Sequence, residues 1–296
     1  MSATSSHAVS SRAMLISLSI SQWSGRRLDK AITEELNQQH GAESDASRVN
    51  KLLLPKQALD PIQRIVSETR TAFYQRTLPW MDNGSRIMAA GAYLDHMAWV
   101  RGQAAKYETA IDDLIRSYPA YVADAQRRMG QLFKSEDYPR AEDLRAKFSL
   151  NCSVLPVPSA DDFRVEMGDE QAAQIRKDIE EQVMAATKTA VDDAYRRVID
   201  AVSRMVERLN AYRPATRKGD RSEGIFKDTL VENIRDLIDT LPALNITGDP
   251  NLTATAADLR ALVKHDAQTL RDDATVRRNV ATEAQRILDS VSDFLA

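Results

Sequence analysis

The sequence predicts a predominantly α-helical α+β protein: a long antiparallel helical hairpin resembling a coiled coil, a small β-sheet at its base and additional C-terminal helices. Apolar residues recur with a period of about 3.6 over residues 169–212, and no Pro or Gly interrupts them. Residues 93–118 carry apolar side chains at alternating steps of three and four, which is a heptad pattern. Short alternating or extended stretches around these two segments indicate strands.

The composition is that of an ordinary globular protein. The chain has 296 residues, 43% of them hydrophobic and 28% charged, and its net charge is −3. This balance does not favour a strongly basic nucleic-acid binder or an acidic mimic of nucleic acid. The single cysteine, Cys152, excludes an intramolecular disulfide. Without a secretory signal or a long apolar run, we expect a cytoplasmic protein that does not bind membranes.

The N-terminal part predicts a tail, a strand and a helix. Residues 1–12 are small and polar, and we expect a disordered tail. Residues 14–22 alternate Ile or Leu with Ser, which predicts a half-buried strand. A helix with Leu28, Ile32 and Leu36 on one face is expected to run from Ser24-Gly25 to about Gly41. Residues 49–54 fit either a strand or a helix.

The central part predicts a helix, a hairpin and the first long helix. Asp60-Pro61 is typical of a helix start, and the apolar pattern continues to about residue 74. A turn-forming cluster between residues 77–80 and 86–89 predicts a hairpin. The helix over 93–118 is expected to kink or restart at Pro119.

The C-terminal half predicts further helices around the second long one. A short helix at 140–148 precedes extended segments at 149–158 and 163–165. The long helix 169–212 follows, then a charged loop and three helical segments. We therefore divide the chain into a tail, a region with the sheet and first helical arm, the second arm and a C-terminal helical region: 1–12, 13–168, 169–212 and 213–296.

Catalytic motifs are absent from the sequence. It has no phosphate-binding glycine loop, zinc-ligand spacing or nucleophile elbow, so we assign no catalytic, cofactor or metal-binding residue and expect a non-enzymatic protein. His96 beside Asp95 fits a solvated helical histidine better than a ligand, and Cys152 fits a buried thiol. The stretch Asp249 to Thr253 fits a helix cap better than a cation loop.

Two kinds of interaction surface remain. For protein partners, including a second copy of the chain, the candidates are a turn and leftover apolar positions on the second long helix: Trp80, Asp82, Asn83, Val191, Val202 and Val206. For single-stranded nucleic acid, the candidates are two basic clusters: Arg26, Arg27, Lys30, Arg213, Arg217, Lys218 and Arg221. Trp23 and Trp80 would then stack on bases, although tryptophans near strands are more often core residues. An enzyme with an unrecognised site is the third alternative.

Three segments resemble a phage and prophage family catalogued only as a domain of unknown function. They are LISLSISQWSGRRLDK, VNKLLLP and, above all, TLPWMDNGSRIM followed by a long helix. The resemblance implies a bacteriophage or prophage origin, action in the host bacterial cytoplasm, and a gene often near one for a MoxR-like AAA+ ATPase. It implies no established activity and no catalytic residues. We therefore expect an interaction or assembly protein whose partners are other proteins, itself or that ATPase.

Overall fold

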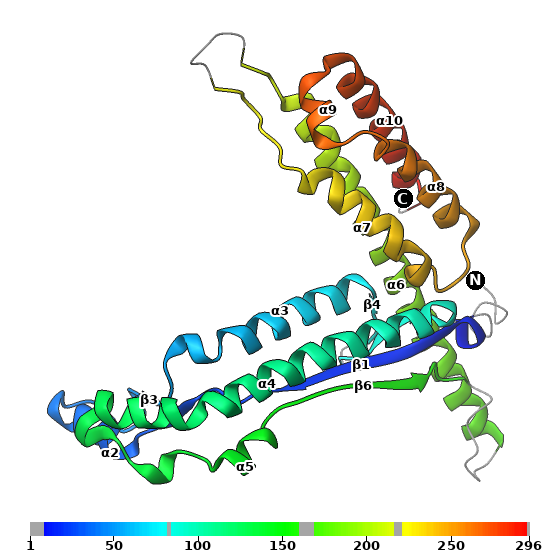
Figure 1. Ribbon diagram of the computed structural model, residues 1–296. Coiled ribbons are helices and arrows are strands. Elements are labelled where there is room, and N and C mark those ends of the chain that lie inside the picture. Colours follow the sequence, from blue (N-terminus) through cyan, green and yellow to red (C-terminus); the bar gives the residue numbers. More distant parts are fainter. Residues whose placement is uncertain (1–8, 82–83, 160–168, 216–220, 295–296) are drawn as a thin grey trace. The chain divides into compact units, whose positions relative to one another are not determined.

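The structure is a computed structural model that describes residues 9–81, 84–159, 169–215 and 221–294. It is α+β and mostly helical, with two long helices, a small antiparallel sheet and C-terminal helices, as the sequence predicts (Figure 1). The chain forms two compact units that interleave in sequence. Unit 1 comprises Met1–Ser17, Tyr74–His96 and Ser153–Ala296, and unit 2 comprises Leu18–Phe73 and Met97–Cys152. This division follows spatial contacts and not the sequential segments expected above.

A four-stranded sheet has the strand order β4-β5-β1-β6. Its strands are β1 (Ala13–Ser21), β4 (Leu78–Pro79), β5 (Arg86–Ala89) and β6 (Ser149–Pro156). The β4–β5 pair is antiparallel, which confirms the predicted hairpin, and β5 also pairs antiparallel with β1. The expected strand at 163–165 lies outside the described residues.

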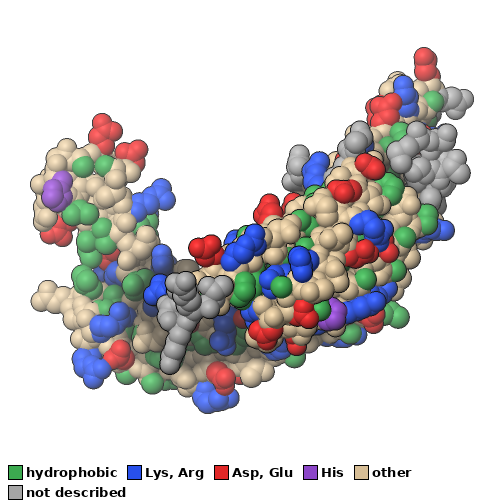
Figure 2. Space-filling view, turned by 90° about the horizontal axis from the view of Figure 1, so that it is seen from above, with side chains coloured by type: hydrophobic (Ala, Val, Ile, Leu, Met, Phe, Trp, Pro, Cys, Tyr) green, Lys and Arg blue, Asp and Glu red, His purple; other side chains and the backbone are tan. Residues whose placement is uncertain are grey.

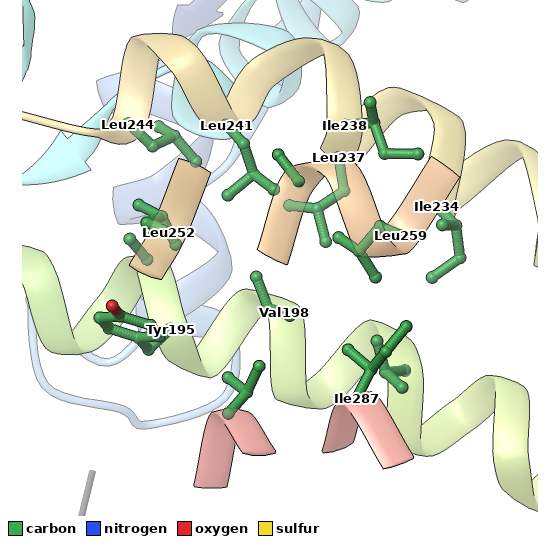
Figure 3. Close-up of a cluster of buried hydrophobic side chains, with 14 of the residues drawn as sticks. Tyr195, Val198, Ile234, Leu237, Ile238, Leu241, Leu244, Leu252, Leu259 and Ile287 are labelled. Atoms are coloured by element: carbon green, nitrogen blue, oxygen red, sulfur yellow. The ribbon is translucent and has the colours of Figure 1, made fainter. Parts of the chain in front are cut away.

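Unit 1 is built around α6 (Asp169–Ala211), the second predicted long helix. It packs against α7 (Thr229–Leu244) and α10 (Ala274–Ser292), while α8 (Pro250–Leu262) packs against α7 and α10 and α9 (Ala267–Asp272) against α10. Figure 3 shows side chains of α6, α7, α8 and α10 meeting in one apolar core, among them Val198, Ile234, Leu259 and Ile287. Three helical segments were expected here, and the short α9 is a fourth.

Unit 2 contains most of α4 (Tyr93–Met129), the helix with the heptad pattern. Its seam residues Tyr107, Ile111 and Leu114 are buried with Leu144 of α5 (Ala141–Arg145). The same core includes buried residues of α3 (Asp60–Gln75), which begins at Asp60 as the sequence predicts. The described residues also form short 3-10 segments: η1 (Lys56–Ala58), η2 (Ala90–Ala92), η3 (Gly130–Leu132) and η4 (Ser135–Asp137).

The two long helices do not bury their stripes in the way we expected. The stripe of α6 lies in the core of unit 1 with α7, α8 and α10, and the seam of α4 lies in the core of unit 2 with α3 and α5. A helical period shows that a face is buried but does not identify what covers it. Each helix therefore finds its apolar neighbours within its own unit, where amphipathic partners are available.

Three local expectations are also corrected. Residues 9–12, expected in the tail, are described, and Val9 is only 1% exposed within the core of unit 1. The first predicted helix begins later, as α2 (Lys30–Gln39), because Asp29 caps it by accepting a hydrogen bond from the Ile32 N–H. Helix α4 continues through Pro119, so it does not restart there.

Candidate functional site

A two-stranded ribbon replaces the expected start of the first helix. Strands β2 (Arg26–Leu28) and β3 (Asn50–Leu52) pair antiparallel in unit 2. Gly25, directly before β2, has a φ of +63°, and a Cβ there would lie 2.9 Å from Leu59 Cδ1. Glycine is thus favoured at this bend chiefly by its backbone conformation, since a Cβ would also displace the end of the Leu59 side chain. The bend turns the chain out of β1 and into the ribbon.

A buried ion cluster fixes the ribbon to its neighbours. The side chain of Lys51 is only 4% exposed, and its Nζ lies 3.1 Å from Asp29 Oδ2 and in contact with Asp137 Oδ2. The Lys51 ammonium also donates to the Leu132 carbonyl at 3.4 Å. The cluster therefore ties β3, the start of α2 and η4 together. A buried ammonium needs such partners, because an unpaired buried charge is strongly destabilising.

The charges of this cluster reinforce one another. Burial by itself lowers the pKa of Lys51, but the hydrogen bonds to Asp137 and Asp29 outweigh it and the pKa is raised. The pKa of Asp29 is lowered, first by the hydrogen bond from the Ile32 backbone N–H and then by Lys51. Lys51 supplies one positive charge against the two carboxylates that it contacts, and Arg27, whose Nε lies 3.6 Å from Asp137 Oδ1, supplies a second.

An open hollow of about 740 Å³ lies against β2 and the ion cluster. Arg26, Lys30 and Lys134 line it, and their side chains form no hydrogen bond or ion pair with any described residue. Arg27 also lines the hollow, with its Nε 3.6 Å from Asp137 Oδ1. Lys51 and Arg27 offset Asp29 and Asp137, so Arg26, Lys30 and Lys134 face one further carboxylate, Glu136, and the rim keeps a basic character. Such a rim attracts anionic groups.

Two leucines lie on the outer face of the ribbon. The register pairs Arg26 with Leu52 and Leu28 with Asn50, which places these four residues on the face opposite Arg27 and Lys51. Leu28 is 40% exposed and Leu52 is 47% exposed. Figure 2 shows basic and acidic side chains interspersed over one face of the molecule. Leu28 and Leu52 thus form a small apolar patch beside the basic hollow.

The two predicted basic clusters belong to different units. Arg26, Arg27 and Lys30 lie in unit 2, whereas Arg213 and Arg221 lie in unit 1. The guanidinium of Arg213 donates to the carbonyl oxygens of Asn210 and Tyr212 at 2.7 and 2.9 Å, so it caps the end of α6. Arg221 is exposed. The other two predicted contacts, Arg217 and Lys218, lie outside the described residues.

The tryptophans are placed as core residues. Trp80 is 1% exposed and belongs to the core of unit 1, so it cannot stack on a base without leaving that core. Trp23 is half-buried and meets the ring of Tyr118 edge-on, with the ring centroids 6.1 Å apart. The predicted interaction residues Asp82 and Asn83 lie outside the described residues.

The valines expected to form an exposed docking stripe on α6 are not exposed. Val202 is 0% exposed, Val206 is 8% exposed, and Val191 is half-buried against the same core. The expectation was wrong because α6 is covered by both α7 and α10 and therefore buries a wider surface than its main stripe.

A cleft of about 330 Å³ lies between α6 and α7 in unit 1. Arg197 on its wall already has several partners: it pairs with Asp193 at 2.8 Å and donates to the carbonyl oxygens of Gln75 and Thr77 at 2.9 Å. Arg86 binds the same Thr77, and its pKa is lowered by burial and by the nearby Arg197. These arginines hold the chain directly after α3 and thus have a structural role.

The other candidate residues also have structural explanations. Asp249 caps α8 by accepting a hydrogen bond of 2.8 Å from the Asn251 N–H, as expected for a helix cap at residues 249–253. The second oxygen of Asp249 accepts a hydrogen bond of 2.6 Å from Tyr195, and burial raises the pKa of that tyrosine. His96 is 2% exposed, so it is not the solvated histidine we expected. Burial also raises the pKa of Cys152.

Sequence reasoning found only part of the ribbon site. Arg26, Arg27 and Lys30 were identified as basic residues, but Lys51, Lys134 and the exposed Leu52 were not. Their segments are distant in the chain, and strands of three residues are too short to give a clear alternating pattern. The apolar run at 49–54 was the one available signal of β3, because it was compatible with a strand as well as with a helix.

No protein-family model, curated protein or solved structure matches this chain. Among the described residues, no helix is both long enough and apolar enough to cross a membrane. In the same part of the chain, no three His, Cys, Asp or Glu side chains are grouped so that they could hold a metal ion.

Proposed function

We propose that this chain is a non-enzymatic interaction protein that acts by binding other proteins through the β2–β3 ribbon. The observation that carries the proposal is the outer ribbon face, where Leu28 and Leu52 are 40% and 47% exposed beside Arg26 and the basic hollow. Leaving two large apolar side chains in water is unfavourable, and covering them on binding recovers roughly 25 cal/mol per Å² of buried apolar surface. Surrounding cations add selectivity for an acidic partner.

The sequence resemblance supplies the setting of this proposal. From that resemblance we propose a phage or prophage origin and action in a bacterial host cytoplasm, with a MoxR-like AAA+ ATPase or a second copy of the chain among the partners to test. Single-stranded nucleic acid is less favoured, because Trp80 is buried and Trp23 is half-buried, so neither offers an open ring for stacking on a base.

The proposal is tested by comparing two double variants in the full chain. Leu28→Ser with Leu52→Ser makes the ribbon face polar, and Leu94→Ser with Ile225→Ser is the matched control because those side chains are 76% and 63% exposed elsewhere. Each protein is used for affinity purification from the bacterial cells in which it is expressed, followed by quantitative mass spectrometry. Light scattering over a range of concentrations measures self-association in the same samples.

We expect either a defined partner protein or a dimer of the chain. The amount of partner recovered, or of dimer formed, should fall at least tenfold with the ribbon variant and stay unchanged with the control variant. A strict monomer at all concentrations, together with no protein reduced by the ribbon variant, would refute the proposal. Salt-sensitive binding of a labelled single strand that both double variants retain would favour the nucleic-acid alternative instead.

A further inference from the structure

The hydrogen bonds at the ends of the ribbon determine which backbone groups of β2 face outwards. The Leu53 N–H donates to the Gly25 carbonyl at 2.9 Å, and the Asp29 N–H donates to the Val49 carbonyl at 2.9 Å. In an antiparallel pair, hydrogen-bonded and non-hydrogen-bonded residue pairs alternate. Arg27 and Lys51 are therefore the hydrogen-bonded pair between these ends. The backbone groups of Arg26 and Leu28 consequently point away from β3.

The two outer edges of the ribbon differ. On β3, the Arg128 guanidinium donates to the Leu52 carbonyl at 3.1 Å and occupies that edge. On β2, the Arg26 N–H has the Ser24 hydroxyl at 3.3 Å, whereas the Leu28 N–H and the carbonyls of Arg26 and Leu28 have no partner among the described residues. The basic hollow lies against this same strand. Three of the four outward backbone groups of β2 thus have no partner in the described part of the chain, and they lie beside an open hollow.

We infer that the β2 edge binds an extended, acidic peptide segment of a partner protein as an added β-strand. The inference rests on the proposed function and specifies its partner. The outward N–H and C=O groups of β2 supply main-chain hydrogen bonds, which is how exposed sheet edges bind peptides. This pattern of alternating donors and acceptors matches a peptide backbone and not a sugar–phosphate chain.

The two faces of the ribbon define the side chains of the bound segment. Successive residues of an added strand point to opposite faces. One set meets the face that carries Leu28 and Leu52, and this favours apolar side chains. The other set meets the face of Arg27, and the hollow against β2 adds Lys30 and Lys134 opposed by one further carboxylate, Glu136, so the excess of cations favours acidic side chains. The expected ligand therefore alternates apolar and acidic residues.

A proline substitution tests the main-chain part of the inference. Leu28→Pro removes the outward N–H, which makes no bond to β3, so the ribbon itself keeps its hydrogen bonds. Leu28→Ala is the matched control, because it shortens the side chain and keeps the N–H. Circular dichroism and hydrogen exchange of the Lys51 region establish that both variants fold.

The probe is a yeast-displayed library of random decapeptides, sorted against the labelled full-length chain. We expect enrichment of peptides that alternate apolar and acidic residues. The affinity of a selected peptide, measured by fluorescence anisotropy, should fall at least tenfold with Leu28→Pro and less than threefold with Leu28→Ala. Lys30→Glu combined with Lys134→Glu should shift the enrichment away from acidic peptides.

Three results would overturn the inference: no enriched peptide, enriched peptides without acidic residues, or an affinity that Leu28→Pro leaves unchanged. A 20-nucleotide single strand that displaces the selected peptide and still binds the Leu28→Pro variant would identify nucleic acid as the occupant of this surface. That result would also overturn the inference. A cellular partner that is lost with the double serine variant but retained by Leu28→Pro would leave the proposed function standing and refute strand addition alone.

Discussion

Replacing Lys51 by methionine should selectively destabilise unit 2. Methionine keeps most of the aliphatic length of lysine, but it removes the ammonium that lies between Asp29 and Asp137. The side chains of these two carboxylates are only 7% and 9% exposed, so the substitution leaves two shielded negative charges close together. Each keeps one other partner, since Asp29 accepts from the Ile32 N–H and Asp137 lies near Arg27.

The expected loss is about 3 kcal/mol in the free energy of unfolding. Removing one partner of a buried ion pair typically costs about 3–5 kcal/mol, because the remaining charge stays buried without compensation. The lower end applies here, because both carboxylates retain a second interaction. An exposed pair behaves differently: Lys177 and Glu181 are 66% and 60% exposed, and such pairs contribute about 0–1 kcal/mol. Lys177→Met is therefore the matched control.

Guanidinium chloride denaturation combined with native-state hydrogen exchange measures this effect unit by unit. Lys51→Met should accelerate exchange in residues 26–52 and leave residues 195–209 of α6 unchanged, while Lys177→Met changes neither. The pKa of Asp29 is lower in the folded protein than in the unfolded chain. The stabilisation by this carboxylate is therefore present above its unfolded pKa and lost as the pH falls through its folded pKa. The difference between the variant and the wild type should therefore shrink below about pH 4. A loss under 1 kcal/mol at pH 7, or an equal effect in α6, would refute the assignment of a buried, unit-specific cluster.

Two further predictions concern unit 1. The pKa of His96 is lowered to about 4, first by burial and then by Arg76, so the unfolded chain binds the proton more readily than the folded one. The free energy of unfolding should be fully retained above about pH 6.5 and fall by about 2 kcal/mol towards pH 4, after allowance for solvent screening. Thermal melts should show that the stability of His96→Gln depends less on pH than that of the wild type. An unchanged pH dependence would contradict the burial argument. Ile234 is 0% exposed, so Ile234→Ala should lower the free energy of unfolding, measured by chemical denaturation, by about 2–5 kcal/mol. The control Ile225→Ala changes a side chain that is 63% exposed, and it should alter this free energy by less than about 0.5 kcal/mol.

The elements that the sequence predicted well are those with strong local signals. Helix α6 extends over Asp169–Ala211, close to the predicted 169–212, because forty residues of uninterrupted helical periodicity leave few alternatives. Helix α3 begins at Asp60, where an acidic residue precedes a proline. The β4–β5 hairpin follows from a cluster of turn-forming residues between two short apolar runs. Each signal lies within a few turns of chain.

The candidate site lacked such signals. Arg26, Arg27 and Lys30 stood out as a basic cluster, but the same local pattern predicted a helix where the chain forms β2. The capping carboxylate of Asp29 starts the helix later, and pairing with β3 then holds the preceding residues extended. This pairing and the contact of Lys51 with Asp137 join segments that are distant in the chain.

The sequence alone thus determined the long helices and the main apolar stripe that each of them buries. Only the tertiary structure decided what covers each face: it placed α7 and α10 over the valines of α6 and left Leu28 and Leu52 exposed on the ribbon. The physical reason is that periodicity depends on backbone geometry over a few residues. Burial and ion pairing depend on which distant side chains occupy the same space, and no local pattern encodes that.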